Sequence, residues 1–191
     1  MSSITATVVA VFLTPQSHHF RTQQVAGLNL DLEGIPGDRH YGFTRTAGAR
    51  EKWYPAGMTM RSGRQVTIVS VEELTRIAHA MKVAEVKPEW LGANILILGV
   101  PDFSSIPWGT RLFFENGATL VNEGGNAPCR FVGREVAAHY PEQNDLDLLF
   151  VKSAKNRRGI VASVEQAGSI RPGPVRLKIP DVKNWNGGRL I

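Results

Sequence analysis

The sequence is poor in cysteine: Cys129 is the only one among 191 residues. One thiol cannot form an internal disulfide, and it cannot supply the several thiolates of a zinc or iron–sulfur site. This scarcity is typical of proteins in a reducing compartment, so we expect the chain to be cytoplasmic. Cys129 is then the only thiol available for chemistry.

A secretory signal and a membrane span are also missing from the pattern. The stretch from Ile4 to Leu13 is apolar, but no Lys or Arg precedes Arg21, so there is no basic region of the kind that opens a signal peptide. No apolar run approaches the roughly 18 residues that a spanning helix requires. We expect a buried first strand, no contact with a membrane, and one domain covering residues 1–191.

Motifs for nucleotides and for protein-bound metals are absent as well. The glycines between residues 34 and 42 match neither Gly-x-Gly-x-x-Gly nor a phosphate loop ending in Gly-Lys-Ser/Thr. His18-His19, His79 and His139 lack a spacing that would put two ligands on one helix face, and we expect His79 and His139 at the surface. Aromatic residues make up 8% and do not interleave with a basic stretch, so nucleic-acid binding is not expected.

Positive charge is abundant by contrast. The net charge is +5 and the pI about 9.7, and Arg supplies most of the 22 basic residues. The planar guanidinium binds phosphate or carboxylate in two places, so this composition favours a small anionic ligand. The alternative is a solvated basic face. Arg157-Arg158, at the start of a predicted strand, could face a ligand, but paired arginines at a strand start usually meet water, and that is what we expect here.

The apolar pattern predicts a mainly β protein with a few short helices. Short runs bounded by Gly, Pro or Asn predict strands at Ile4–Leu13, Arg64–Val69, Asn94–Leu98, Arg111–Glu115, Ala118–Val121, Gly159–Val164 and Val175–Ile179. Their spacing and Gly-rich turns favour an antiparallel sheet closing on itself over a βαβ alternation.

Helices are expected in few places. Ser70 and Glu73 form an S-x-x-E capping box before a helix over 71–81. A second helix is expected over 130–139, with short turns near 88–91 and 145–151. A long irregular loop, of the kind that often carries function, is predicted from Gly34 to Arg61.

Cys129 is the first candidate functional residue. It follows Asn126-Ala-Pro128 and precedes Arg130, between a predicted strand end and a predicted helix start. Unpaired amides at a helix N-terminus and a neighbouring cation both favour thiolate over thiol, and the thiolate attacks sulfur or binds a metal. The alternative is a small buried hydrophobic residue with no chemical role.

A second candidate cluster is Gly34-Ile-Pro-Gly37-Asp38-Arg39-His40. Its glycines let backbone amides approach a ligand closely, while Asp38, Arg39 and His40 add a carboxylate, a guanidinium and a titratable ring. The alternative is a surface turn in which Asp38 accepts hydrogen bonds from its own backbone.

Taken together, these pieces resemble the MOSC domain, named for the C-terminal part of molybdenum cofactor sulfurases. The resemblance rests on ordered segments that span nearly the whole chain: Gly34–His40, the run from Arg64 to Ser70, Leu91-Gly92-Ala-Asn94-Ile95, Asn126–Cys129 and Gly168–Gly173. Gly173 is followed by Pro174 where an aspartate is common in the family, which puts any role of that loop in doubt.

The resemblance implies a closed or partly closed β-barrel in which Cys129 handles sulfur or ligates the molybdenum of a pterin cofactor (molybdopterin). Gly37, Asp38, Arg39, His40, Arg64, Asn126 and Arg130 are the expected cofactor-binding residues. Nothing resembles the pyridoxal-phosphate desulfurase domain of larger relatives, so a sulfur donor protein or a redox partner is expected. Sulfur carrier and molybdopterin-dependent reductase both remain open, as does a non-catalytic basic module that binds an anionic ligand or nucleic acid with Cys129 structural.

Overall fold

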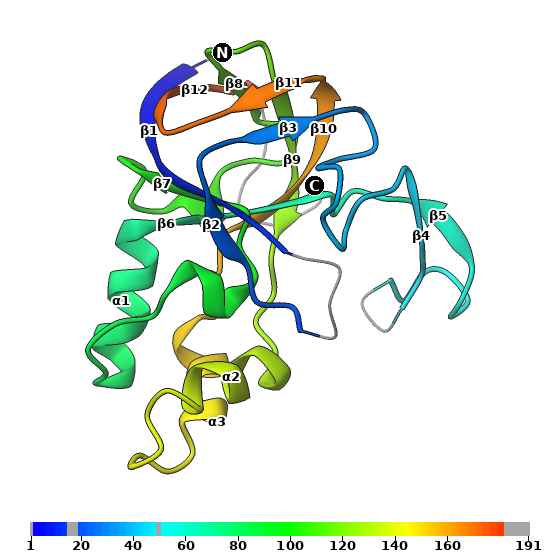
Figure 1. Cartoon of the computed structure of the whole chain (residues 1–191). Coiled ribbons are helices and arrows are strands. Elements are labelled where there is room, and N and C mark those ends of the chain that lie inside the picture. Colours follow the sequence, from blue (N-terminus) through cyan, green and yellow to red (C-terminus); the bar gives the residue numbers. More distant parts are fainter. Residues whose placement is uncertain (1, 15–18, 49–50, 182–191) are drawn as a thin grey trace.

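Seven strands close into a barrel in the computed structural model, which describes residues 2–14, 19–48 and 51–181 (Figure 1). The ring runs β12 (Gly173–Ile179), β8 (Arg111–Phe114), β9 (Thr119–Gly125), β10 (Ile160–Gln166), β6 (Val66–Ser70), β7 (Ile95–Leu98) and β1 (Ser2–Leu13), and β1 pairs again with β12. β6 and β7 are parallel, and the other neighbours in the ring are antiparallel. The predicted β-barrel and its seven strands are confirmed, with boundaries shifted by a few residues.

Five further strands have three residues each. β2 (Gln23–Val25) pairs with the end of β1, β3 (Leu28–Leu30) pairs with β11 (Gly168–Ile170), and β4 (Thr44–Thr46) pairs with β5 (Thr59–Arg61). The sequence predicts none of them, and β4 and β5 interrupt the stretch from Gly34 to Arg61 that we expected to be irregular. Three residues are too few for a period of two to be recognised.

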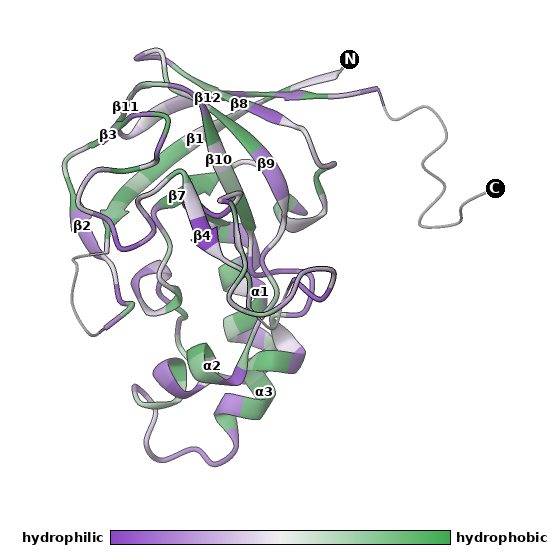
Figure 2. Ribbon diagram, turned by 90° about the vertical axis from the view of Figure 1, so that its right-hand side faces the viewer, coloured by the Kyte–Doolittle hydropathy of each residue, from purple (hydrophilic) through white to green (hydrophobic). Residues whose placement is uncertain are grey.

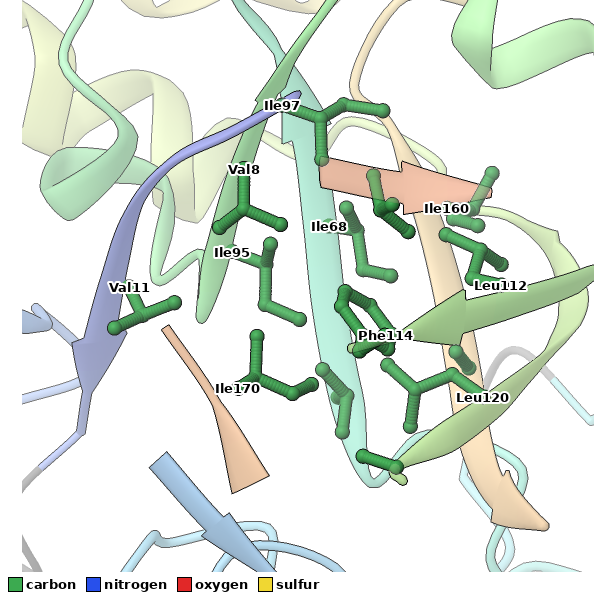
Figure 3. Packing of buried hydrophobic residues seen from close by; sticks show 14 of the residues in the cluster. Val8, Val11, Ile68, Ile95, Ile97, Leu112, Phe114, Leu120, Ile160 and Ile170 are labelled. Carbon is green, nitrogen blue, oxygen red and sulfur yellow. The ribbon is translucent and has the colours of Figure 1, made fainter. Parts of the chain in front are cut away.

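Aliphatic side chains fill the barrel. Ile68, Ile95, Ile97, Leu112 and Ile160 are completely buried there, and Figure 3 shows these side chains, which come from β6, β7, β8 and β10, gathered in the interior. Each buried side chain of this size contributes roughly 1.5–3 kcal/mol relative to an exposed one. The inward-facing side chains of these strands therefore provide the barrel's main stabilisation.

A helical layer covers one side of the barrel, below it in Figure 1. It contains α1 (Val71–Met81), α2 (Arg130–Ala137), α3 (Leu146–Ser153) and the 3-10 helix η1 (Pro88–Leu91); a second 3-10 turn, η2 (Phe103–Ser105), lies against β6 and β9. Figure 2 shows both hydrophobic and hydrophilic residues on these helices. Among the described residues, none of the helices has the length and apolarity needed to cross a membrane.

The helical layer has its own core, which shares strands with the barrel. Val69 and Leu96 point outward from β6 and β7 into it, where they join Ile77, Val136 and Phe150. Neighbouring residues on these strands point inward, because side chains alternate along a strand. β6 is accordingly buried at all five positions.

The predicted helices are confirmed, but the capping box forms only in part. The Ser70 Oγ accepts the Glu73 amide at 3.3 Å, as expected for an N-cap. The Glu73 carboxylate turns away from Ser70 and accepts the Ser104 amide at 2.8 Å and the Ser104 hydroxyl at 2.7 Å. Burial raises the pKa of Glu73, and the hydrogen bonds from Ser104 oppose that rise only in part. Glu73 thus joins α1 to η2.

Candidate functional site

Cys129 lies at the N-cap of α2, directly after the chain leaves β9. Its backbone is extended, with φ −140° and ψ 157°, and its carbonyl accepts the Gly133 amide at 3.0 Å. The side chain makes no capping hydrogen bond. It is half-buried and packs on the edge of the helical core. Both placements predicted from the sequence, after a strand and before a helix, are confirmed.

The segment before Cys129 is held from three directions. The Asn126 amide donates to the Gly159 carbonyl at 2.9 Å, and its side-chain oxygen accepts the Arg64 guanidinium at 3.0 Å. Arg158 donates to the carbonyl of Ala127 at 3.4 Å and to that of Leu91 at 3.0 Å. The backbone leading to the thiol is therefore fixed by β10 and by two arginines.

Arg158 is buried, with 6% of its surface exposed, so our expectation that Arg157-Arg158 both meet water is wrong for this residue. A guanidinium offers five donors in a fixed fork, which allows it to bind two carbonyls from different segments. Arg158 thus joins the Cys129 segment to η1, a contact that local sequence patterns do not predict.

Arg130, the predicted cation beside the thiol, is paired with a carboxylate. Its Nε donates to the Asp147 Oδ2 at 2.5 Å, which joins the start of α2 to the start of α3. This hydrogen bond holds the pKa of Asp147 below its usual value. The charge of Arg130 is thus compensated within the protein, and its role in ligand binding stays a prediction.

Asp38 anchors the Gly34–His40 segment to the barrel. Its carboxylate, with no exposed surface, accepts the Thr14 amide, the Asn94 side-chain amide and the His40 amide, each at 2.9 Å. The His40 ring lies 3.2 Å from the same carboxylate. Burial alone would raise the pKa of Asp38, but these hydrogen bonds, with that of the His40 side chain first, lower it overall.

This network explains the exposure of the neighbouring residues. Asn94 is itself fully buried and accepts the Thr67 amide at 3.0 Å, so Asp38 is tied through it to β6. With Asp38 fixed inward, Arg39 and His40 are exposed at the surface. Gly37 forms the exposed turn before them, with φ 84°, a conformation that favours glycine. Asp38 is placed to orient the segment, while Arg39 and His40 face outward.

An open cavity of about 530 Å³ lies beside this segment. Its walls come from the Asp38 segment, from the β4–β5 hairpin and from the start of β6. The lining residues are Arg39, His40, Tyr41, Thr44, Arg45, Gly48, Glu51, Ser62 and Arg64. Three guanidiniums and an imidazole face one carboxylate, so the cavity suits an anion.

The single carboxylate is itself neutralised. Glu51 forms a short ion pair with Arg45 and accepts the Gly48 amide at 2.9 Å. The Arg45 hydrogen bond, the largest effect, lowers the pKa of Glu51, with Arg64 adding a smaller electrostatic contribution. Glu51 therefore shapes the hairpin, and Arg39 and Arg64 are the other guanidiniums in the lining of this cavity.

The structure brings several predicted site residues together. Arg39, His40 and Arg64 line one cavity, and Arg64 connects that cavity to Asn126, three residues before Cys129. Cys129 is not among the lining residues. Within the described ranges, no three His, Cys, Asp or Glu side chains cluster closely enough to hold a metal ion. His18 lies outside the described residues, while His139 stacks on Trp90 with ring centroids 3.9 Å apart and has its side chain 30% exposed.

The barrel, the buried aspartate segment and the cysteine at the helix start define the class of protein. The sequence profile of the MOSC domain matches residues 17–175, and the chain belongs to this family.

Similar proteins support this assignment. The YuaD protein of Bacillus subtilis (strain 168), whose name refers to metal-sulfur cluster biosynthesis, is 44% identical over 154 residues, which cover 81% of this chain and 80% of that protein. The crystal structure of YuaD matches with a TM-score of 0.91 and 38% identity, over 94% of this chain and 98% of that one. The crystal structure of YiiM from Escherichia coli shares the fold, with a TM-score of 0.58 and 17% identity over 92% of this chain and 70% of that one.

Proposed function

We propose that this chain is a sulfur carrier that holds sulfur as a persulfide on Cys129. The observation that carries the proposal is the position of the thiol: half-buried at the start of α2, on a segment fixed by Arg64 and Arg158. The name of the YuaD relative, which refers to metal-sulfur cluster biosynthesis, agrees with a role in sulfur supply.

The chemistry is a transfer between thiols. The Cys129 thiolate attacks the outer sulfur of a donor persulfide, the donor S–S bond breaks, and the donor leaves as a thiolate. Cys129 then holds the persulfide, with no net oxidation of the pair. The hydrogen bonds from Arg64 and Arg158 keep the backbone before Cys129 in place, and the half-buried residue leaves part of its surface open to the donor.

The test uses the fact that the chain has one cysteine. The purified protein is treated with sodium polysulfide, desalted and measured by intact mass; we expect one added sulfur atom that is removed by a reducing thiol. Cys129→Ser, which has no thiol, should gain none. An unreactive wild-type protein, or equal sulfur uptake by the serine variant, would contradict the proposal.

A molybdopterin cofactor is a second candidate, and the cationic cavity favours it. Arg39 and Arg64 suit the phosphate of such a cofactor, and Cys129 offers a soft sulfur ligand for its metal. The described residues offer no cluster of several metal ligands, so a metal would be held mainly by the pterin. When bound, the cofactor would supply two-electron redox chemistry. We expect molybdenum to copurify from cells that make the cofactor, and to be lost in Arg64→Glu.

If the chain is instead a non-catalytic basic module, loss of the Cys129 thiol should have no effect on its binding. Binding of an anion or a nucleic acid by such a module would weaken steeply with salt and would be unchanged in Cys129→Ser.

A further inference from the structure

A β-hairpin arm projects from the barrel beside the cationic cavity. The arm consists of residues 43–48 and 51–62, with β4 paired to β5, and it extends to the right of the barrel in Figure 1. Two carbonyls at its base, those of Leu32 and Gly42, accept hydrogen bonds from Gln65, at 2.9 and 3.5 Å. Arg61 pairs with Glu123 of β9 at 3.4 Å. The arm is thus attached at its base and open to solvent along its length.

The arm exposes large apolar side chains. Trp53 is 73% exposed, Phe43 53%, Met58 49% and Tyr54 42%. Clusters of exposed apolar residues on a soluble protein commonly mark an interaction site, and Trp, Tyr, Met and Arg are enriched in protein–protein interfaces. The apolar side chains of the arm are therefore those expected of a protein-docking surface.

The charge of the arm selects the kind of partner. Its described residues include Arg45, Lys52 and Arg61, and the only carboxylate among them, Glu51, is buried against Arg45. Arg64 and Arg39 continue the positive charge across the adjoining cavity. A surface of this kind attracts an acidic partner and repels a basic one.

The composition of the arm favours a protein over a nucleic acid. Platforms for single strands present aromatic faces on which bases stack. Here Trp53 and Tyr54 meet edge to face, with centroids 6.5 Å apart and planes at 64°, and Met58 adds a flexible aliphatic contact. These features suit an irregular protein surface.

We propose that the arm is the docking surface for an acidic protein that delivers sulfur to Cys129. The proposal rests on the proposed carrier function. Its geometric support is the continuous connection from the arm, through the cavity wall, to Arg64 and from there to Asn126 in the Cys129 segment. A protein bound on the arm would cover the cavity, whose Arg64 is joined to the Cys129 segment through Asn126.

The test combines cross-linking with sulfur transfer. A photoreactive benzophenone amino acid replaces Trp53, or Leu148 on α3 as a control of similar apolar character, in cells that naturally make this chain. We expect position 53 to capture a protein with a net negative charge that position 148 does not capture. That protein is then purified, loaded with persulfide sulfur and mixed with the carrier.

Cross-linking of a protein at position 53 supports the proposal only if that protein also transfers sulfur to Cys129. We expect the captured protein to load Cys129, with transfer about tenfold slower in Trp53→Ala and in Arg61→Glu, a change of about 1.4 kcal/mol. Leu148→Ala and Lys152→Glu on α3 should match the wild type. Added salt should slow transfer to the wild type, because the attraction is electrostatic.

Other outcomes overturn the proposal. Capture of a nucleic acid, capture equal at positions 53 and 148, or equal transfer to the arm variants would each do so. Treatment with sodium polysulfide separates this failure from failure of the carrier function, since it needs no docking. If the wild type and Trp53→Ala both gain sulfur from polysulfide while the transfer result fails, only the docking surface is wrong.

Discussion

Arg158 connects two segments that are far apart in the sequence, and its charge is buried behind the Cys129 segment. We expect Arg158→Met to lower the free energy of unfolding by about 2 kcal/mol, because two carbonyls lose their donor. Urea unfolding at pH 7 measures this loss.

Two variants serve as controls. Arg158→Lys keeps the charge but lacks the fork that reaches both carbonyls, so it should recover only part of the lost stability. Arg157→Met, at the exposed neighbouring residue, should leave the free energy of unfolding unchanged. Equal urea transitions for Arg158→Met and the wild type would show that these two hydrogen bonds do not stabilise the fold.

The buried carboxylate of Asp38 leads us to expect that the fold loses stability in acid. Its pKa is lowered in the folded state, so the stability it contributes is fully present above its unfolded value, about 3.9, and is lost as the pH falls through the lower folded value. Asp38→Asn should cost about 3 kcal/mol at pH 7, because the new amide faces the Thr14 and Asn94 donors. Urea unfolding between pH 7 and pH 2 measures both effects. Parallel curves for the two proteins would contradict this assignment.

The sequence places some site residues and misses others for a physical reason. Cys129 and the Gly34–His40 segment are recognisable because their turn residues and neighbours are contiguous. Arg45 and Arg158 are missed because their roles depend on contacts with distant segments, namely the pairing of β4 with β5 and the approach of Ala127 and Leu91. Local patterns cannot show which of two adjacent arginines is buried.

At the scale of elements, the chain just before β10 packs so closely on β6 that Gly159 has no space for a side chain. Gly159 has φ 72°, and a Cβ there would lie 1.9 Å from the Ile68 carbonyl oxygen. Its own backbone also binds the Asn126 amide and the Ser104 hydroxyl. We expect Gly159→Ala to lower the free energy of unfolding by about 3 kcal/mol or more, because it adds a clash to an unfavourable backbone conformation.

Gly57 provides the matched control for this measurement. It has φ 84°, but nothing lies within 4 Å of where its Cβ would be. Gly57→Ala should therefore cost only about 1 kcal/mol, from the backbone conformation alone. Equal losses in thermal or urea unfolding would mean that β10 and β6 separate easily at this point.

The strands that the sequence predicts well are those in which buried apolar residues recur over a long stretch. β1 and β12 alternate buried and exposed residues over much of their length, while β10 begins with five consecutive buried residues. Glu73 shows the opposite case, since its local motif assigned it to the Ser70 amide while tertiary packing brought it to Ser104. A capping motif therefore predicts the hydrogen bonds of its own side chains only where no donor from a distant segment competes for them.

At the scale of the molecule, two hydrophobic cores lie on opposite faces of β6 and β7. Because they share strands, we expect them to unfold together, as one domain would. Leu120→Ala in the barrel and Phe150→Ala in the helical layer should each cost about 3 kcal/mol. Circular dichroism and tryptophan fluorescence should give one coincident urea transition in both variants. Separate transitions would contradict the prediction of one domain for residues 1–191.

The pairing of β1 with β12 also has a consequence during synthesis on the ribosome. Ser2 lies opposite Ile179 and Val8 opposite Gly173, so within the ring the strand that is made first pairs with the strand that is made last. Until β12 is made, β1 and β8 each expose an unpaired row of amides and carbonyls, a template for pairing with other nascent chains. We therefore expect β1 and β8 to be the strands at which an incomplete chain is most prone to aggregate.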